Sequence, residues 1–205
     1  MKKILVLILS FFTLFSYQSH AQDGSYFGVY LGSNMSALTG VDKYEPKALP
    51  GADVGFVFSG RGKVIGWDFD LYYSFRQSDF KDVSSRYTYH FLGLDFMFKV
   101  YPFKKLGLNA QLGYQLNADM GKYSSINNLF IRGFVLGLGY DINKRWVVDI
   151  STWKSAQPVA ERSIEELEYP PDGGLPQQVW NTYSFYLSTF SLTVTYRIWE
   201  IKGEH

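Results

Sequence analysis

Residues 65–76 read IGWDFDLYYSFR and alternate between two kinds of side chain. Apolar or aromatic residues occupy every odd position from Ile65 to Phe75, and mostly glycine or polar residues lie between them. A period of two places successive side chains on opposite faces of a β-strand. The segment is therefore predicted to form a strand with one apolar and one polar face.

The same alternation recurs along the chain and predicts eight strands in all. The predicted strands are Ser25–Ser33, Gly51–Ser59, Val64–Arg76, Arg86–Tyr101, Leu106–Ala118, Asn128–Ile142, Arg145–Trp153 and Tyr183–Trp199. A transmembrane β-strand needs about 9–11 residues, so most of these segments are long enough to cross a membrane.

The connections between these strands alternate in length. Short turns are predicted at 60–63, 102–105 and 143–144, and long loops at 34–50, 77–85, 119–127 and 154–182. Outer-membrane barrels have short periplasmic turns and longer external loops, and an even strand number places both termini with the short turns. The sequence therefore predicts an all-β fold, an eight-stranded antiparallel up-and-down transmembrane β-barrel.

The polar face of the strands separates a membrane barrel from a soluble one. In the predicted strand Leu106–Ala118 that face carries only glycine, asparagine and glutamine. A soluble exterior is rich in Lys and Glu, whereas small uncharged groups suit a narrow, filled lumen. Aromatic residues of the apolar face also gather near both strand ends, which is typical of the two girdles of a membrane barrel. The aromatic residues of these two groups are Trp67, Tyr140, Trp146 and Tyr196, and Tyr73, Phe75, Phe130 and Tyr186.

The first residues have the pattern of a secretory signal peptide. Lys2 and Lys3 precede an apolar run from Ile4 to Tyr17, and Ser19-His20-Ala21 fits a cleavage site. We expect residues 1–21 to be removed on export and residues 22–205 to form one barrel domain in the outer membrane. The alternative is an uncleaved anchor, for which the run is short.

Composition excludes several functional classes. The chain has 205 residues, 20 Lys and Arg against 19 Asp and Glu, and no cysteine. The charge balance gives no indication of nucleic-acid binding. Without cysteine there is no disulfide framework, thiolate metal site or cysteine nucleophile. No cofactor or metal site is predicted.

Seven charged residues are predicted to point into the barrel, because they have the parity of the polar face. They are Asp53, Asp68, Asp70, Asp95, Lys99, Asp149 and Arg197. Eight strands enclose only enough space for side chains, and an unpaired charge there costs several kcal/mol. One interpretation is a salt-bridge network that fills the lumen. The other is a gated narrow pore in which Lys99 or Arg197 changes acidic partners.

Two outward features are candidate contacts. The longest loop is acidic, with Glu161, Glu165, Glu166 and Glu168, and Ser163–Glu168 has the capping pattern of a short helix. That loop is either a solvated segment or a site for a divalent cation or a basic partner. Arg132 interrupts the apolar face of its strand near the external end, where it either snorkels or pairs with a lipid phosphate.

Enzymatic interpretations have little support in the chain. Asp68 and Asp70 share one face of a strand, as an acid–base pair does, but they point into a space too narrow for a substrate. Thr88 and His90 lie two residues apart on the outward face, an arrangement used by some membrane lipid hydrolases, yet no acid stands near to orient the His. We therefore predict a non-enzymatic protein.

Two segments resemble the PorT-like outer-membrane β-barrel family. Residues 89–102 read YHFLGLDFMFKVYP and residues 108–114 read LNAQLGY, which is similar to the family's aromatic strand, Tyr-Pro turn and glycine-containing strand. The resemblance implies an outer-membrane barrel and an accessory role beside a protein partner. The leading functional hypothesis is a structural or accessory subunit that contacts membrane lipid and binds partners through external loops. The alternative is a narrow channel for ions or small solutes.

Overall fold

The computed structural model describes residues 24–40, 45–80, 86–103, 106–120, 130–168 and 177–201. The predicted signal peptide and the start of the mature chain lie outside these ranges and stay predictions. Within them, no helix has the length and hydropathy of a membrane-spanning helix. The described chain forms nine strands: β1 (Gly24–Thr39), β2 (Pro46–Arg61), β3 (Ile65–Phe80), β4 (Tyr87–Val100), β5 (Leu108–Asp119), β6 (Phe130–Asp141), β7 (Trp146–Ser155), β8 (Ala160–Glu168) and β9 (Gln177–Ile201).

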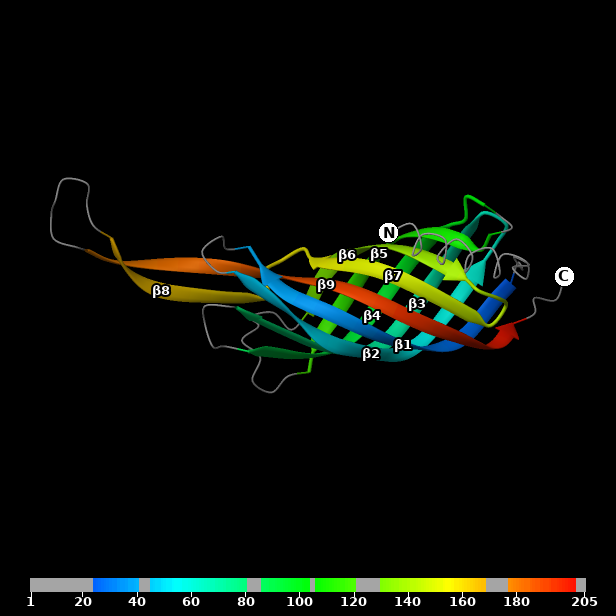
Figure 1. Ribbon diagram of the computed structural model, residues 1–205, viewed down its shortest axis with the longest axis horizontal. Helices are drawn as coiled ribbons and strands as arrows, with labels where there is room; N and C mark the ends of the chain where they lie inside the picture. Colours follow the sequence, from blue (N-terminus) through cyan, green and yellow to red (C-terminus); the bar gives the residue numbers. More distant parts are fainter. Residues whose placement is uncertain are drawn as a thin grey trace, which may run out of the picture.

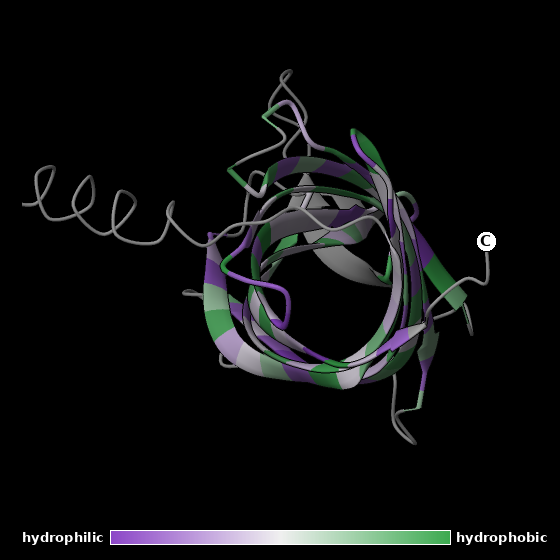
Figure 2. Ribbon diagram, turned by 90° about the vertical axis from the view of Figure 1, so that its right-hand side faces the viewer, coloured by the Kyte–Doolittle hydropathy of each residue, from purple (hydrophilic) through white to green (hydrophobic). Residues whose placement is uncertain are grey.

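Eight of these strands close into a barrel (Figures 1 and 2). The order is β1 to β7 followed by β9, every neighbouring pair is antiparallel, and β1 pairs with β9 to complete the ring. Closure gives every barrel strand a hydrogen-bonding neighbour on both sides and so removes the free edges of the sheet. The predicted eight-stranded antiparallel barrel is confirmed.

The ninth strand corrects the predicted loop 154–182. β8 pairs with the first part of β9, from Ala160 opposite Phe185 to Glu168 opposite Gln177, and the two form a hairpin that projects beyond the barrel (Figure 1). The predicted helical turn at Ser163–Glu168 is wrong, because these residues lie in β8. A capping pattern is a local signal, whereas here interstrand pairing with residues 177–182 sets the backbone conformation.

Several strands are also longer than predicted at the end of the barrel that carries this hairpin. β1 continues to Thr39, β2 begins at Pro46, and β3 continues to Phe80, so the connections between them are shorter than expected. Small polar residues interrupt the alternation there, yet Asn34 and Ser36 are buried inside the barrel and paired with neighbouring strands. We call this the hairpin end, and we call the opposite end, with the β2–β3, β4–β5 and β6–β7 connections, the turn end.

The two faces of the wall differ as the period of two predicts. Large apolar side chains cover the outside, and Leu31, Phe134 and Leu138 are each more than 60% exposed. Polar and charged side chains, including Arg76, Lys99, Asn117 and Gln115, are buried inside. A water-soluble domain rarely exposes contiguous apolar surface on this scale, so the wall is built for an apolar surrounding.

Candidate functional site

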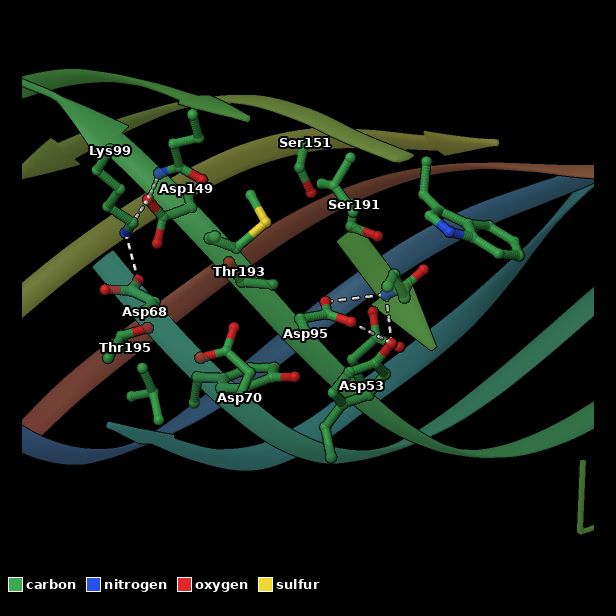
Figure 3. Close-up of a pocket in the computed structure, with 18 of the residues that line it drawn as sticks. Asp53, Asp68, Asp70, Asp95, Lys99, Asp149, Ser151, Ser191, Thr193 and Thr195 are labelled. Carbon is green, nitrogen blue, oxygen red and sulfur yellow. Dashed lines mark hydrogen bonds and ion pairs between the residues drawn. The ribbon is translucent and has the colours of Figure 1, made fainter. Parts of the chain in front are cut away.

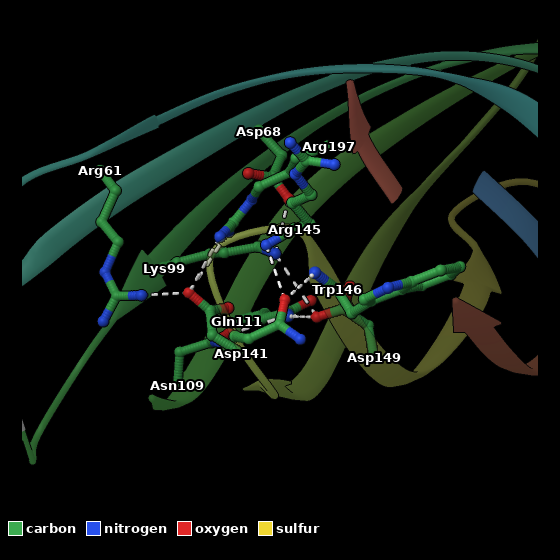
Figure 4. A network of polar contacts seen from close by, with 11 residues as sticks. Arg61, Asp68, Lys99, Asn109, Gln111, Asp141, Arg145, Trp146, Asp149 and Arg197 are labelled. Carbon is green, nitrogen blue, oxygen red and sulfur yellow. Dashed lines mark hydrogen bonds and ion pairs between the residues drawn. The ribbon is translucent and has the colours of Figure 1, made fainter. Parts of the chain in front are cut away.

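All seven charged residues predicted for the lumen lie on the inward face of their strands. Asp53 comes from β2, Asp68 and Asp70 from β3, Asp95 and Lys99 from β4, Asp149 from β7 and Arg197 from β9. Figure 3 shows six of them around one cavity in the barrel interior, and Arg197 lies nearer the turn end (Figure 4). Their shared parity brings residues from five strands into one narrow space.

The layer nearest the turn end is centred on Asp141, the last residue of β6. Its Oδ2 accepts hydrogen bonds from Arg61 Nη1 and from Arg197, whose Nη2 lies 3.3 Å away (Figure 4). Arg61 also lies over the ring of Tyr101, 3.9 Å from its centroid, and Arg197 over Tyr26. The three charged side chains are at most 7% exposed. One carboxylate and two stacked rings therefore hold two buried guanidinium groups.

Tyr101 follows β4 directly and closes this layer. Burial raises the pKa of Tyr101 well above its usual value, with the nearby Asp141 carboxylate acting in the same direction. Its hydroxyl therefore keeps its proton at every physiological pH, and the ring presents a neutral face to Arg61. The stacking of Arg61 on the Tyr101 ring is therefore not disturbed by loss of the phenol proton.

The next layer is built around Lys99. Its Nζ lies 2.5 Å from Asp68 Oδ2 and 3.4 Å from Asp149 Oδ1. Asp149 also accepts a hydrogen bond from Gln111, whose amide lies 2.8 Å from Asn109 (Figure 4). A buried ammonium between two carboxylates is paired on both sides, which is the condition under which such charges are tolerated in an interior.

Glycines on the inner face of the wall make room for these side chains. A Cβ at Gly139 would collide with Asp149, Gln111 and Asn109, and a Cβ at Gly93 would collide with the ring of Tyr72. Glycines on the inner face of β4 and β6 thus leave space for the side chains of neighbouring strands.

A third group joins Asp95 to neutral partners. Its Oδ1 lies 3.0 Å from the Tyr72 hydroxyl and its Oδ2 2.9 Å from Gln115 Nε2. The Tyr72 hydroxyl also lies 2.8 Å from Asn117 Oδ1. On β2, Asp53 accepts a hydrogen bond of 3.0 Å from Asn34 of β1. These two carboxylates are held by amides and a phenol and not by cations.

Asp70 differs from the other lumen carboxylates. Its Oδ1 is buried without a hydrogen-bond donor, and among the described residues no hydrogen bond or ion pair reaches its carboxylate, whereas Asp68 and Asp95 in the same space each have a partner (Figure 3). The cavity beside it has a volume of about 60 Å³ and is faced on the other side by hydroxyls of β7 and β9. One water occupies about 10–15 Å³ in such a measure, so the space suits a few waters and excludes a sugar or a nucleotide.

The interior changes character toward the hairpin end. Buried apolar side chains from β1, β3, β4, β6, β7 and β9 meet there, with Val159 from the segment after β7, in what we call the apolar cluster. Its members are Leu38, Phe80, Tyr89, Phe91, Met97, Ile131, Val135, Trp153, Val159, Phe185 and Leu187. Arg76 lies at its border, with its guanidinium 4.8 Å from the Trp153 ring centroid and its Nε 2.9 Å from Ser74 Oγ. The cluster fills this half of the barrel with side chains.

Three charged residues of the lumen were missed in the sequence. The sequence predicts a turn at 60–63 that includes Arg61, but β2 continues to this residue. Asp141 and Arg76 have the inward parity of their predicted strands and could have been found by extending the alternation to the strand ends. Their omission hid the layer of two arginines and one aspartate.

The outward candidates lie apart from the lumen. Arg132 is exposed near the hairpin end of β6. His90 lies 2.5 Å from the Tyr73 hydroxyl, so its ring has an aromatic partner and not an acid. The backbone of Glu161, Glu165, Glu166 and Glu168 lies in β8, outside the barrel. Among the described residues, no three acidic or histidine side chains are arranged to hold a metal ion.

No protein-family model and no curated protein matches the chain. The family resemblance therefore stays a prediction. Among solved structures, a Neisserial surface protein, NspA, is 11% identical with a TM-score of 0.48, covering 86% of this chain and all of that one. OprG from Pseudomonas aeruginosa is 13% identical with a TM-score of 0.48, covering 88% of this chain and 98% of that one. Ail of Yersinia pestis, solved with the heparin analogue sucrose octasulfate, is 12% identical with a TM-score of 0.44, covering 86% and 100%. At these identities and scores no function is transferred from them.

Proposed function

We propose that this protein is an integral outer-membrane β-barrel that acts as a non-enzymatic structural or accessory subunit, binding a protein partner through the β8–β9 hairpin. The observation that carries the proposal is this hairpin, which extends the barrel wall far beyond its rim (Figure 1). The hairpin is joined directly to the rigid barrel, and segments that project from a rigid scaffold commonly carry binding residues.

The outward wall supports a membrane location. Apolar side chains cover it along every barrel strand, and aromatic pairs lie at the turn end, including Trp146 with Tyr196, whose ring centroids are 4.8 Å apart. Aromatic residues at the edge of an apolar band are typical of the membrane interface. With the short turns on the periplasmic side, the hairpin would face the cell exterior.

The outer edges of the hairpin are where a strand of a partner could pair with its backbone. The pairing of β1 with β9 stops at Thr39 opposite Tyr186, and within the described part of the chain residues 177–182 of β9 pair with β8 alone. A free strand edge offers hydrogen-bond donors and acceptors to an added strand of a partner. The four glutamates of β8 favour a partner with a basic surface.

The test removes the hairpin without opening the barrel. Val159 N donates a hydrogen bond of 2.7 Å to Phe185 O, so these residues are adjacent and an Asn-Gly turn can replace residues 160–184. The wild type and the deletion variant, each with a C-terminal tag, are purified from native outer membrane in mild detergent. Co-purifying proteins are quantified by mass spectrometry. We expect a stoichiometric partner with the wild type and its loss with the deletion.

A matched variant separates the charges from the backbone. Replacing Glu161, Glu165, Glu166 and Glu168 by Gln keeps the hairpin but removes its acidity. Loss of the partner in both variants assigns binding to the charges, and loss in the deletion alone assigns it to the strand edges. Identical co-purification from wild type and deletion, or a wild-type barrel that purifies alone, contradicts the proposal.

A narrow channel is the second candidate, favoured by the cavity that five aspartates line. The apolar cluster lies on one side of that cavity, and the layer of Arg61, Arg197 and Asp141 lies on the other. Conduction therefore requires side chains of both to move. Planar-bilayer recording of the purified wild type distinguishes the two functions. A silent bilayer supports the accessory role, and a small cation-selective conductance that falls in Asp70→Asn supports the channel.

A further inference from the structure

The lipid-facing wall carries an unneutralised pair of cations at the hairpin end. Arg132 and Lys154 are both exposed and both have outward parity, on the neighbouring strands β6 and β7. Phe134 pairs directly with Lys154, and Arg132 is two residues from Phe134 on the same face. Such diagonal neighbours lie about 7–8 Å apart, within reach of one shared ligand for two long side chains.

The surroundings of the pair contain no acid on this face. The outward neighbours are Leu116 and Ala118 of β5, Phe130 and Phe134 of β6, Thr152 and Ala156 around Lys154, and Ser188 of β9. No ion pair connects either cation to another described side chain. The connection between β5 and β6, residues 120–129, contains one lysine and no acidic residue.

The position along the strand indicates the depth of the pair. On β6 the outward residues from Phe134 to Tyr140 are all apolar or aromatic, and Arg132 comes immediately beyond them. A cation on the lipid face costs about 2–4 kcal/mol at the midplane but only about 0–1 kcal/mol near the interface. The next outward residue of β6 is Phe130, one of the aromatic residues expected at the membrane interface, so we place the two cations close to the lipid head groups.

We infer that Arg132 and Lys154 form a binding site for a phosphate of an outer-leaflet glycolipid. The guanidinium of Arg132 supplies a planar fork that matches phosphate oxygens, and the Lys154 ammonium adds a second charge from the adjoining strand. Phe130 and Phe134 flank Arg132 and offer an apolar surface to the acyl chains. The inference rests on the proposed outer-membrane location but not on the hairpin partner.

The experiment uses the full-length mature protein in detergent micelles and bisphosphorylated lipid A as the probe, with affinity read by native mass spectrometry. The test variant is Arg132→Gln with Lys154→Gln. The control is Lys63→Gln with Lys144→Gln, which removes the same charge from exposed positions at the turn end. We expect the test variant to bind roughly 10- to 30-fold more weakly, from about 1 kcal/mol for each cation near a charged surface, and the control to bind as the wild type does.

Two further arms identify the ligand chemistry. Dephosphorylated lipid A should bind the wild type as weakly as lipid A binds the test variant, and inorganic phosphate alone should not compete. Competition by inorganic phosphate would assign the site to the free ion and overturn the glycolipid assignment. Equal affinities of test variant and wild type, or equal losses in test and control variants, would overturn the site itself.

Failure here is distinct from failure of the proposed function. The variant that lacks residues 160–184 keeps Arg132 and Lys154, so it should bind lipid A normally while losing its protein partner. A protein absent from the outer-membrane fraction would refute the proposed location, whatever its affinity for lipid A in micelles.

Discussion

The narrow interior of the barrel is filled by charged side chains in its turn-end half and mainly by apolar side chains in its hairpin-end half. The turn-end half is charged, with Asp141 between Arg61 and Arg197 and Lys99 between Asp68 and Asp149. The hairpin-end half is mainly apolar and is packed with rings and aliphatic chains around Phe91, with Asn34, Ser36 and Arg76 among its buried polar side chains. A barrel of eight strands is thus filled either by paired charges or by apolar packing, and a cavity lies between the two halves.

The stability of the two halves depends on different conditions. Apolar packing is stabilised by every contact that it makes, whereas a buried charge is tolerated only while its partner is present. We therefore expect substitutions in the charged half to depend on whether a partner is left behind, and substitutions in the apolar half to depend on volume.

The largest effect is expected from Asp141→Asn. The substitution leaves Arg61 and Arg197 buried without a carboxylate, and removing one member of a buried pair costs about 3–5 kcal/mol. The free energy of unfolding, measured by urea titration in lipid vesicles, should fall by that amount. Glu200→Gln, an exposed change at the same end, is the control. A loss below about 1 kcal/mol would show that water replaces the carboxylate.

A somewhat smaller effect is expected from Leu187→Ala in the apolar cluster. Leu187 is fully buried, and truncating such a side chain costs about 2–5 kcal/mol according to how far the surroundings collapse. Leu187→Met, which nearly conserves volume, should cost less than about 1.5 kcal/mol. Equal losses in both variants would mean that shape, and not volume, governs this half.

The smallest effect is expected from Asp70→Asn. Its Oδ1 has no hydrogen-bond donor among the described residues, so removing the charge leaves no partner behind. The free energy of unfolding should stay the same or rise by about 1 kcal/mol, because a buried unpaired charge is unfavourable. A large loss of stability would reveal a cation or ordered water that binds Asp70 and would make the cavity a site in its own right.

Much of this architecture is predictable from local pattern. The alternation around residues 65–76 sets which side chains share a face, and the same parity gives the inward position of Lys99 and its acidic neighbours. The predictions failed where pattern and pairing disagree. Asn34 and Ser36 look like loop residues but lie in β1, and Ser163–Glu168 has a capping pattern but forms β8.

Sequence alone determined the strand parity, the apolar outer wall and the expectation of eight barrel strands, because a period of two and alternating connection lengths are properties of the chain itself. The tertiary structure decided which charges meet. The register places Lys99 between Asp68 and Asp149, and two distant strand ends bring Arg61 and Arg197 to Asp141. It also decided that residues 160–168 extend the wall as a strand. Each of these depends on a partner far along the chain, and no local pattern specifies a partner.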